Sequence, residues 1–185
     1  MIRLNVYKTH PDTIVPEFAT KQSACFDIAF SALGKYEYSG YNKQNKAFSR
    51  KFNNGTIHIM PGDRILVPTG LILDIPVGYS VRIHARSGLS LKQGLVLANA
   101  EGVIDSDYIN ELFVILHNIS DNGADINHGD RIAQGELVVR ELYSILETTD
   151  KPEQKTDRAG GMGSTGVSTP TTPEKRGRGR PKKVA

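Results

Sequence analysis

The stretch PGDRILVPTGLILDIPVGYSVRIH, residues 61–84, places short apolar runs between turns built from Pro and Gly. Arg64–Val67 follows one such turn at residues 61–63, and Tyr79–Ile83 follows another at residues 76–78. Short apolar runs punctuated by turns are typical of the strands of a β-sandwich or β-barrel. The stretch therefore predicts an all-β protein.

The sequence on either side continues this pattern. Residues 2–6 and 56–59 alternate apolar and polar side chains, which is the period of a half-buried strand. The apolar run Leu112–Leu116 is followed by Ser120–Gly123, whose residues favour a hairpin turn. No window of a dozen residues has the period of an amphipathic helix, and we expect only a short helical turn near Ser90–Gln93.

The bulk composition suits one ordinary domain. The chain has 185 residues, of which 38% are hydrophobic. Cys25 is the single cysteine, so an intramolecular disulfide is excluded and nothing indicates an oxidising compartment. The N-terminal ten residues are too polar for a signal peptide, and no apolar run has the length of a membrane span. We expect a cytoplasmic protein, or a nuclear one if its source is eukaryotic or viral.

Two parts of the chain differ in composition from a body that we place at residues 1–157. Residues 34–54 are rich in Lys, Asn, Tyr and Ser, and we expect an insertion that forms a loop or a hairpin. Its interleaved cations and aromatic rings are compatible with stacking on single-stranded nucleic acid, but aromatics that fold back on the body are favoured. Beyond a Gly-rich arm at residues 158–167, the composition of residues 168–185 predicts disorder.

Charge is divided unevenly between the body and this tail. Residues 168–185 hold six basic residues and one acidic residue, so the net charge of +3 leaves −2 for the rest of the chain. A body of this charge that binds a polyanion must concentrate its cations at one site. The tail segment RGRGRPKK, residues 176–183, resembles an AT-hook, which implies binding in the narrow minor groove of A·T-rich DNA. A non-specific basic tail or a nuclear localisation signal explains the same residues equally well.

Three segments carry groups suited to phosphate and sugar chemistry. Arg86-Ser87-Gly88 offers a guanidinium, a hydroxyl and an unobstructed amide on consecutive residues. Gly102–Tyr108 carries carboxylates at positions i and i+2, where one can accept a proton from water beside a sugar. Arg158–Gly166 is Gly-rich, so its amides can wrap a triphosphate, although it lacks the Gly-Lys-Ser/Thr of a Walker A loop. Singly, each segment is also explained by a surface turn, a capping turn or a linker.

Together these segments resemble the signature motifs of the trimeric dUTPase family in order and spacing. The five motifs are Ser23–Asp27, Arg86–Ser90, Asn99–Tyr108, Gly129–Gln134 and Arg158–Gly166. The resemblance covers residues 2–167 apart from the insertion. It implies a jelly-roll-like β-sandwich that assembles as a homotrimer. Motifs one, two and four of each active site would come from one chain, motif three from a second and motif five from the third.

The resemblance also implies an activity: hydrolysis of dUTP to dUMP and pyrophosphate by attack of water on the α-phosphorus. This reaction keeps uracil out of DNA and supplies dUMP. Asp105 would be the catalytic base, Tyr108 would exclude a 2′-hydroxyl, and Mg²⁺ would bridge the phosphates with Asp27 contacting it through water. The substrate-binding residues implied are Arg86, Ser87, Gly88, Asn99, Gly102, Val103, Ile104, Tyr108, Gln134, Arg158, Met162, Gly163, Ser164 and Thr165.

The sequence departs from the family pattern at a few positions. Cys25 stands where Gly or Ala is usual, and His84-Ala85 replaces Ala-Pro before the motif-two arginine. Asn110 replaces a frequent Gly. Met162 replaces an aromatic residue that stacks over the uracil, and its polarizable thioether can still cover a ring.

Two alternative functions stay open at this point. A dCTP deaminase of the same fold needs a glutamate as proton shuttle, and Glu101 is the only nearby candidate. The chain could instead be a DNA-binding or regulatory protein that uses the enzyme body as a scaffold.

Overall fold

The computed structural model describes residues 2–156, and its first compact unit ends at Tyr143. The second unit begins at Ser144, and its described residues 144–156 contain no helix or strand. Within the described residues, no helix is long and apolar enough to cross a membrane. All helices and strands of the described residues lie in the first unit.

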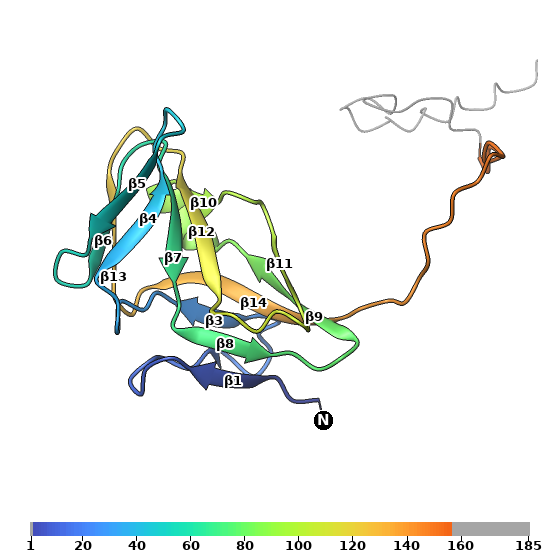
Figure 1. Ribbon diagram of the computed structural model, residues 1–185, viewed down its shortest axis with the longest axis horizontal. Coiled ribbons are helices and arrows are strands. Elements are labelled where there is room, and N and C mark those ends of the chain that lie inside the picture. The colour runs from blue at the N-terminus through green and yellow to red at the C-terminus, as the bar shows by residue number, and fades with distance from the viewer. Residues whose placement is uncertain (1, 157–185) are drawn as a thin grey trace, which may run out of the picture. The chain divides into compact units, whose positions relative to one another are not determined.

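Two five-stranded antiparallel sheets form the body of this unit (Figure 1). The first sheet has the order β10 (Leu95–Leu97), β12 (Phe113–Asn118), β7 (Arg64–Pro68), β4 (Glu37–Tyr41), β5 (Ala47–Lys51). The second has the order β11 (Gly102–Asp105), β9 (Tyr79–His84), β14 (Arg131–Val139), β3 (Phe26–Ala29), β2 (Glu17–Phe18). Two further pairs join β1 (Asn5–Lys8) to β8 (Leu71–Asp74) and β6 (Thr56–Ile59) to β13 (Ala124–Asn127). The predicted jelly-roll-like β-sandwich is confirmed.

The core lies between the two sheets. Its fully buried side chains come from both of them, and include Ile28 and Val81 of one sheet and Ile65 and Leu116 of the other. The helical turn predicted near residues 90–93 is part of one short helix, α1 (Ser87–Gln93). It directly follows β9, so the motif Arg86–Ser90 lies at a strand-to-helix junction.

The sheet that contains β9, β14 and β3 has two unlike faces. Its core face carries buried apolar side chains such as Ile83 and Ile28. Because strand side chains alternate between faces, the intervening residues lie on the opposite face, where Asp27, His84 and Gln134 are half-buried. Gln134 is in register with Asp27 on one side and with His84 on the other, so the three polar side chains form a row.

The segment expected to be an insertion forms the hairpin β4–β5, and β4 extends the first sheet by pairing with β7. Tyr38 is buried and packs against the rings of Phe48 and Phe52. An alanine at Gly40 would place its Cβ 2.3 Å from the carbonyl oxygen of Arg64, so the close pairing with β7 requires glycine there. These three rings are used in packing, whereas Tyr36 and Tyr41 of the same segment are 88% and 51% exposed.

Candidate active site

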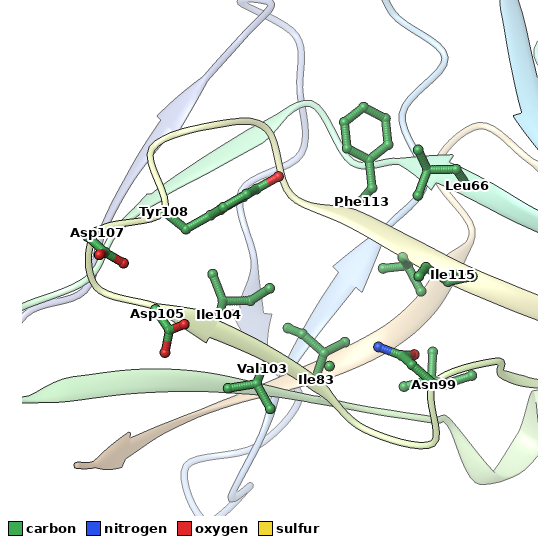
Figure 2. Close-up of a pocket in the computed structure, with 13 residues that line it drawn as sticks. Leu66, Ile83, Asn99, Val103, Ile104, Asp105, Asp107, Tyr108, Phe113 and Ile115 are labelled. Carbon is green, nitrogen blue, oxygen red and sulfur yellow. The ribbon is translucent and has the colours of Figure 1, made fainter.

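A pocket of about 550 Å³ opens beside β11 (Figure 2). Its floor and walls include apolar side chains of β9, β12 and β7, such as Ile83, Ile115 and Leu66. Tyr108 and Asp105 lie toward one end of the pocket, and Asn99 lies toward the other (Figure 2). The predicted site residues that line it are Asn99, Gly102, Val103, Ile104, Asp105 and Tyr108.

Strand pairing and a tight turn position these residues. β11 pairs with β9, with Gly102 opposite Ile83, and a Cβ on Gly102 would lie 2.9 Å from the Cβ of Ile83. Gly102 is therefore required for close packing of the two strands. Ala100, in the turn before β11, has φ +61°, a backbone conformation that is unfavourable for a residue with a Cβ. This strained turn presents Asn99 to the pocket.

The other end of the pocket is held by the turn after β11. The amide of Tyr108 donates to the carbonyl oxygen of Asp105 at 3.2 Å, and the Tyr108 hydroxyl donates to the carbonyl oxygen of Glu111 at 2.9 Å. The ring is thereby fixed at both ends while 38% of the residue stays exposed. The carboxylate of Asp105 has no ion pair or side-chain hydrogen bond within the described part of the chain. It is therefore available to accept a proton from water.

A second cluster of site residues lies on the polar face of the β9–β14–β3 sheet. The guanidinium of Arg86 contacts one carboxylate oxygen of Asp27 at 3.0 Å, and Arg131 donates to the other oxygen at 2.8 Å. Arg86 also donates to the carbonyl oxygen of Arg131 at 3.1 Å, and Gln134 donates to that of Ala85 at 3.0 Å. The cluster holds two permanent cations and one anion, so it keeps a net positive charge, as the binding of a polyanion requires.

Arg131 is a functional candidate that the sequence reasoning missed. Its partner Asp27 is 104 residues away in the chain, and only the pairing of β14 with β3 brings them together. The signal available in the sequence was the turn Gly129-Asp130-Arg131 entering a strand, which is too common to assign a role.

Asp27 was predicted to contact Mg²⁺ through water, and its surroundings limit how it can do so. Each carboxylate oxygen of Asp27 contacts an arginine, so neither oxygen is free of other partners for direct coordination of the ion. Each carboxylate oxygen keeps a second lone pair, and the side chain is 19% exposed. The residue therefore fits an outer contact to a hydrated Mg²⁺, which loses its waters reluctantly.

Gly88 differs from Gly102 in its surroundings. No atom lies within 4 Å of a Cβ placed on Gly88, at the start of α1. Ser87 beside it is exposed as well. Nothing in the described fold requires glycine at position 88, so a ligand could approach the backbone closely there.

One chain does not bring the pocket and the cationic cluster together. Asp105 on β11 pairs with Ser80 on β9. Asp27 on β3 pairs with Gln134 on β14, which in turn pairs with His84 on β9, four residues beyond Ser80. Four residues along a strand span about 13 Å and three strand spacings span about 14 Å, so Asp105 and Asp27 are roughly 20 Å apart. Proton transfer needs hydrogen-bond reach, directly or through one water, and this separation is far beyond that reach.

Glu101, required by the deaminase alternative, is not among the residues that line the pocket. Its carboxylate faces Arg82 at 3.4 Å and His84 at 3.6 Å. The predicted site residues Arg158, Met162, Gly163, Ser164 and Thr165 lie outside the described residues, as does the segment 176–183.

Comparison with known proteins identifies the family of the chain. The dUTPase family profile matches residues 54–166. The deoxyuridine 5′-triphosphate nucleotidohydrolase of Caulobacter vibrioides is 35% identical over 167 residues, 90% of this chain and 94% of the relative. The corresponding protein of Heliobacterium modesticaldum is 32% identical over 170 residues, 91% and 99% of the two chains. The fold is similar to that of Staphylococcus bacteriophage 80alpha dUTPase with dUpNHpp, with a TM-score of 0.70 at 23% identity over 90% of this chain and 100% of the other. The chain belongs to the dUTPase family.

Proposed function

We propose that the chain hydrolyses dUTP to dUMP and pyrophosphate, which keeps uracil out of DNA and supplies dUMP. The observation that carries the proposal is the pocket beside β11, which is lined by a carboxylate without a partner among the described residues, an anchored tyrosine ring and an amide side chain. These are the groups needed to activate water, to fit a deoxyribose and to recognise a base. Membership of the dUTPase family supports the same substrate.

Asp105 is the proposed base. It takes the proton from a water that attacks the α-phosphorus in line with the departing pyrophosphate. Tyr108 packs beneath the deoxyribose, and its anchored ring leaves no room for a 2′-hydroxyl. Asn99 reads the uracil edge, so cytosine would leave a buried polar group without a partner, which is costly.

Arg86 and Arg131, with Ser87, Gly88 and Gln134, are proposed to bind the triphosphate. Their permanent charges offset the repulsion among the phosphate oxygens. Mg²⁺, when bound, neutralises phosphate charge and orients the chain of phosphates. Asp27 would accept hydrogen bonds from the waters of this ion while it holds the two guanidiniums in place.

The separation of roughly 20 Å between Asp105 and Asp27 supports a homotrimer whose sites are shared between chains. In this arrangement the pocket of one copy supplies the base and the sugar site, and the cationic cluster of another binds the phosphates. Residues 158–167 of the third would close over the substrate, with Arg158, Gly163, Ser164 and Thr165 on the phosphates and Met162 over the uracil.

The first test replaces Asp105 by Asn in the full chain and follows pyrophosphate release. We expect the kcat for dUTP to fall by about 100-fold or more, because positioned acid–base groups contribute that much. KM should change little, because the residue acts on water. Asp107→Asn, in the same pocket, is the matched control and should retain activity. An Asp105→Asn rate above about a tenth of wild type would remove Asp105 as the base.

For the C-terminal segment 168–185 we propose DNA binding through the AT-hook-like residues 176–183, separate from hydrolysis. Three tails on one trimer would strengthen weak individual contacts. Fluorescence anisotropy at ~150 mM salt should show tighter binding to A·T-rich than to G·C-rich duplexes, and none after truncation at Val167. Equal affinity for both duplexes would leave only a non-specific basic tail.

A further inference from the structure

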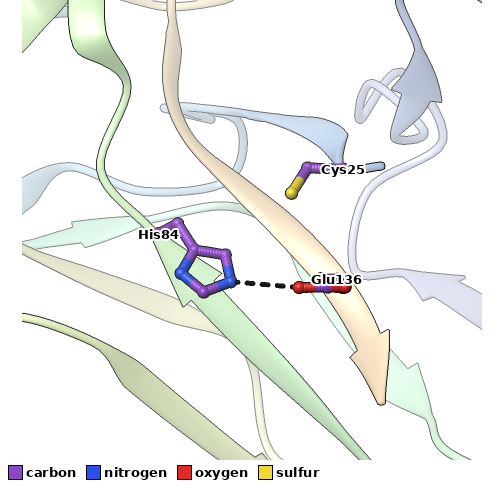
Figure 3. A group of neighbouring side chains, drawn as sticks. All are labelled: Cys25, His84 and Glu136. Carbon is purple, nitrogen blue, oxygen red and sulfur yellow. Dashed lines mark ion pairs between the residues drawn. The ribbon is translucent and has the colours of Figure 1, made fainter. Parts of the chain in front are cut away.

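Three side chains of different chemistry meet on the polar face of the second sheet (Figure 3). Cys25 directly precedes β3, His84 ends β9, and Glu136 lies in β14 between them. The thiol sulfur, a ring nitrogen and a carboxylate oxygen all lie within 4.8 Å of one another. The mechanism proposed for dUTP hydrolysis uses none of these three residues.

The Nε2 atom of His84 has an unusual environment. It is buried and has no hydrogen-bond partner within the described part of the chain. It faces Oε2 of Glu136 at 3.5 Å, which is longer than an N–H···O hydrogen bond. A buried polar atom without a hydrogen bond is costly, so a further ligand on this nitrogen would be stabilising.

The spacing matches that of two ligands on one tetrahedral metal ion. With metal–ligand bonds of about 2.0–2.2 Å for imidazole and carboxylate, two such ligands lie about 3.4 Å apart. The observed separation of His84 Nε2 and Glu136 Oε2 is 3.5 Å. Cys25 is half-buried beside them, with its thiol sulfur within 4.8 Å of both atoms.

The other ring nitrogen of His84 faces a second carboxylate. Nδ1 lies 3.6 Å from Oε1 of Glu101, and Glu101 also lies 3.4 Å from Arg82. Histidines that bind metals commonly direct their second nitrogen to a carboxylate, which sets the tautomer and the ring orientation. At 3.6 Å this contact is also longer than a hydrogen bond, so Glu101 would take up this role only after a small movement of either side chain.

We propose that Cys25, His84 and Glu136 bind a Zn²⁺ ion, with water as the fourth ligand. Thiolate and imidazole ligands favour Zn²⁺, whereas Mg²⁺ prefers oxygen ligands alone. Partial burial and, to a smaller extent, the charge of Glu136 raise the pKa of the Cys25 thiol, so binding releases its proton to solvent.

The ion would connect three adjacent strands next to the cationic cluster. Cys25 is two residues from Asp27, His84 is two residues from Arg86, and Glu136 is two residues from Gln134. Bound Zn²⁺ would therefore hold in place the strands that carry the phosphate-binding side chains. Binding of Zn²⁺ can be measured without any nucleotide, so this proposal is tested separately from the proposed hydrolysis of dUTP.

The test is metal binding by the full chain after removal of metals with a chelator. We expect one Zn²⁺ per chain, release of a proton on binding, and a higher unfolding temperature with Zn²⁺ than without. Co²⁺ in place of Zn²⁺ should give a thiolate-to-metal charge-transfer band. Wild-type protein that binds no Zn²⁺ in competition with a weak chelator would overturn the proposal.

Variants locate the ion. Cys25→Ala should remove the Co²⁺ charge-transfer band. Both Cys25→Ala and His84→Gln should weaken Zn²⁺ binding by at least about tenfold. Glu101→Gln, which removes the outer carboxylate, should weaken it by a similar factor. The matched control is His58→Gln, because His58 pairs with a carboxylate, Asp125, but has no thiol beside it. His58→Gln should bind like wild type. If Cys25→Ala stays folded and binds Zn²⁺ as tightly as wild type, the assignment is wrong.

Discussion

At the scale of single residues, the site glycines Gly88 and Gly102 lie in opposite surroundings. An added Cβ meets open space at Gly88 but the side chain of Ile83 at Gly102. We expect Gly88→Ala to keep or raise the free energy of unfolding, by up to about 1 kcal/mol, because alanine favours the helix. Its KM for dUTP should rise, because the methyl group blocks the approach of a phosphate.

Gly102→Ala should behave in the opposite way. The overpacked contact between β11 and β9 should lower the free energy of unfolding by about 1–3 kcal/mol. Denaturant unfolding and steady-state kinetics of the two variants separate the roles. Destabilisation by Gly88→Ala with an unchanged KM would contradict the assignment of Gly88 to phosphate binding.

Asp27 shows how far residue-level prediction reached. The sequence pattern placed it in motif one, and its presence near Arg86 agrees with the resemblance. The pattern did not predict that both carboxylate oxygens are held by arginines, because Arg131 reaches it only through the register of β14 on β3. Contacts of this kind depend on strand pairing, which residue type and local spacing do not encode.

At the scale of elements, the hairpin β4–β5 is attached to the body by an ion pair whose carboxylate is buried. Arg50 donates to Asp63 at 2.9 Å and lies over the ring of Phe48 at 3.9 Å, and only 3% of the Asp63 side chain is exposed. We expect Arg50→Ala to lower the free energy of unfolding by about 2–4 kcal/mol, because it leaves a buried carboxylate without its cation.

The matched variant is Arg50→Lys, which keeps the charge and loses the planar stacking, and it should lose less stability. Turnover of dUTP by either folded variant should equal that of wild type, because the hairpin contributes no proposed catalytic group. Thermal or denaturant unfolding measures the change. An Arg50→Ala variant as stable as wild type would show that the ion pair does not hold the hairpin.

Strands were predictable where the local pattern of apolar and polar residues matches the way the strand is buried in the fold. The alternation at residues 56–59 and the apolar run at 112–116 correspond to β6 and β12. The hairpin was not predicted as part of a sheet, because its Lys, Asn and Ser residues have no strand period. Pairing of β4 with β7 and burial of Tyr38 stabilise it, and both are tertiary effects.

At the scale of the whole molecule, exposed apolar surface agrees with a chain that associates. Leu142 and Tyr143, the last residues of the first unit, are 82% and 81% exposed. Neighbouring large apolar side chains this exposed are typical of a contact surface. Together with the division of the site residues, this surface favours the proposed homotrimer.

The sharing of each active site between chains is the central claim, and subunit mixing tests it most directly. Arg86→Ala removes the phosphate cluster of a chain and Asp105→Asn removes its base, so each variant alone should be inactive. Unfolded and refolded together in equal amounts, they should form mixed trimers, and the whole mixture should have about a quarter of wild-type activity, because over all trimers an intact cluster meets an intact base at one site in four. A mixture no more active than the two variants refolded separately would contradict the account.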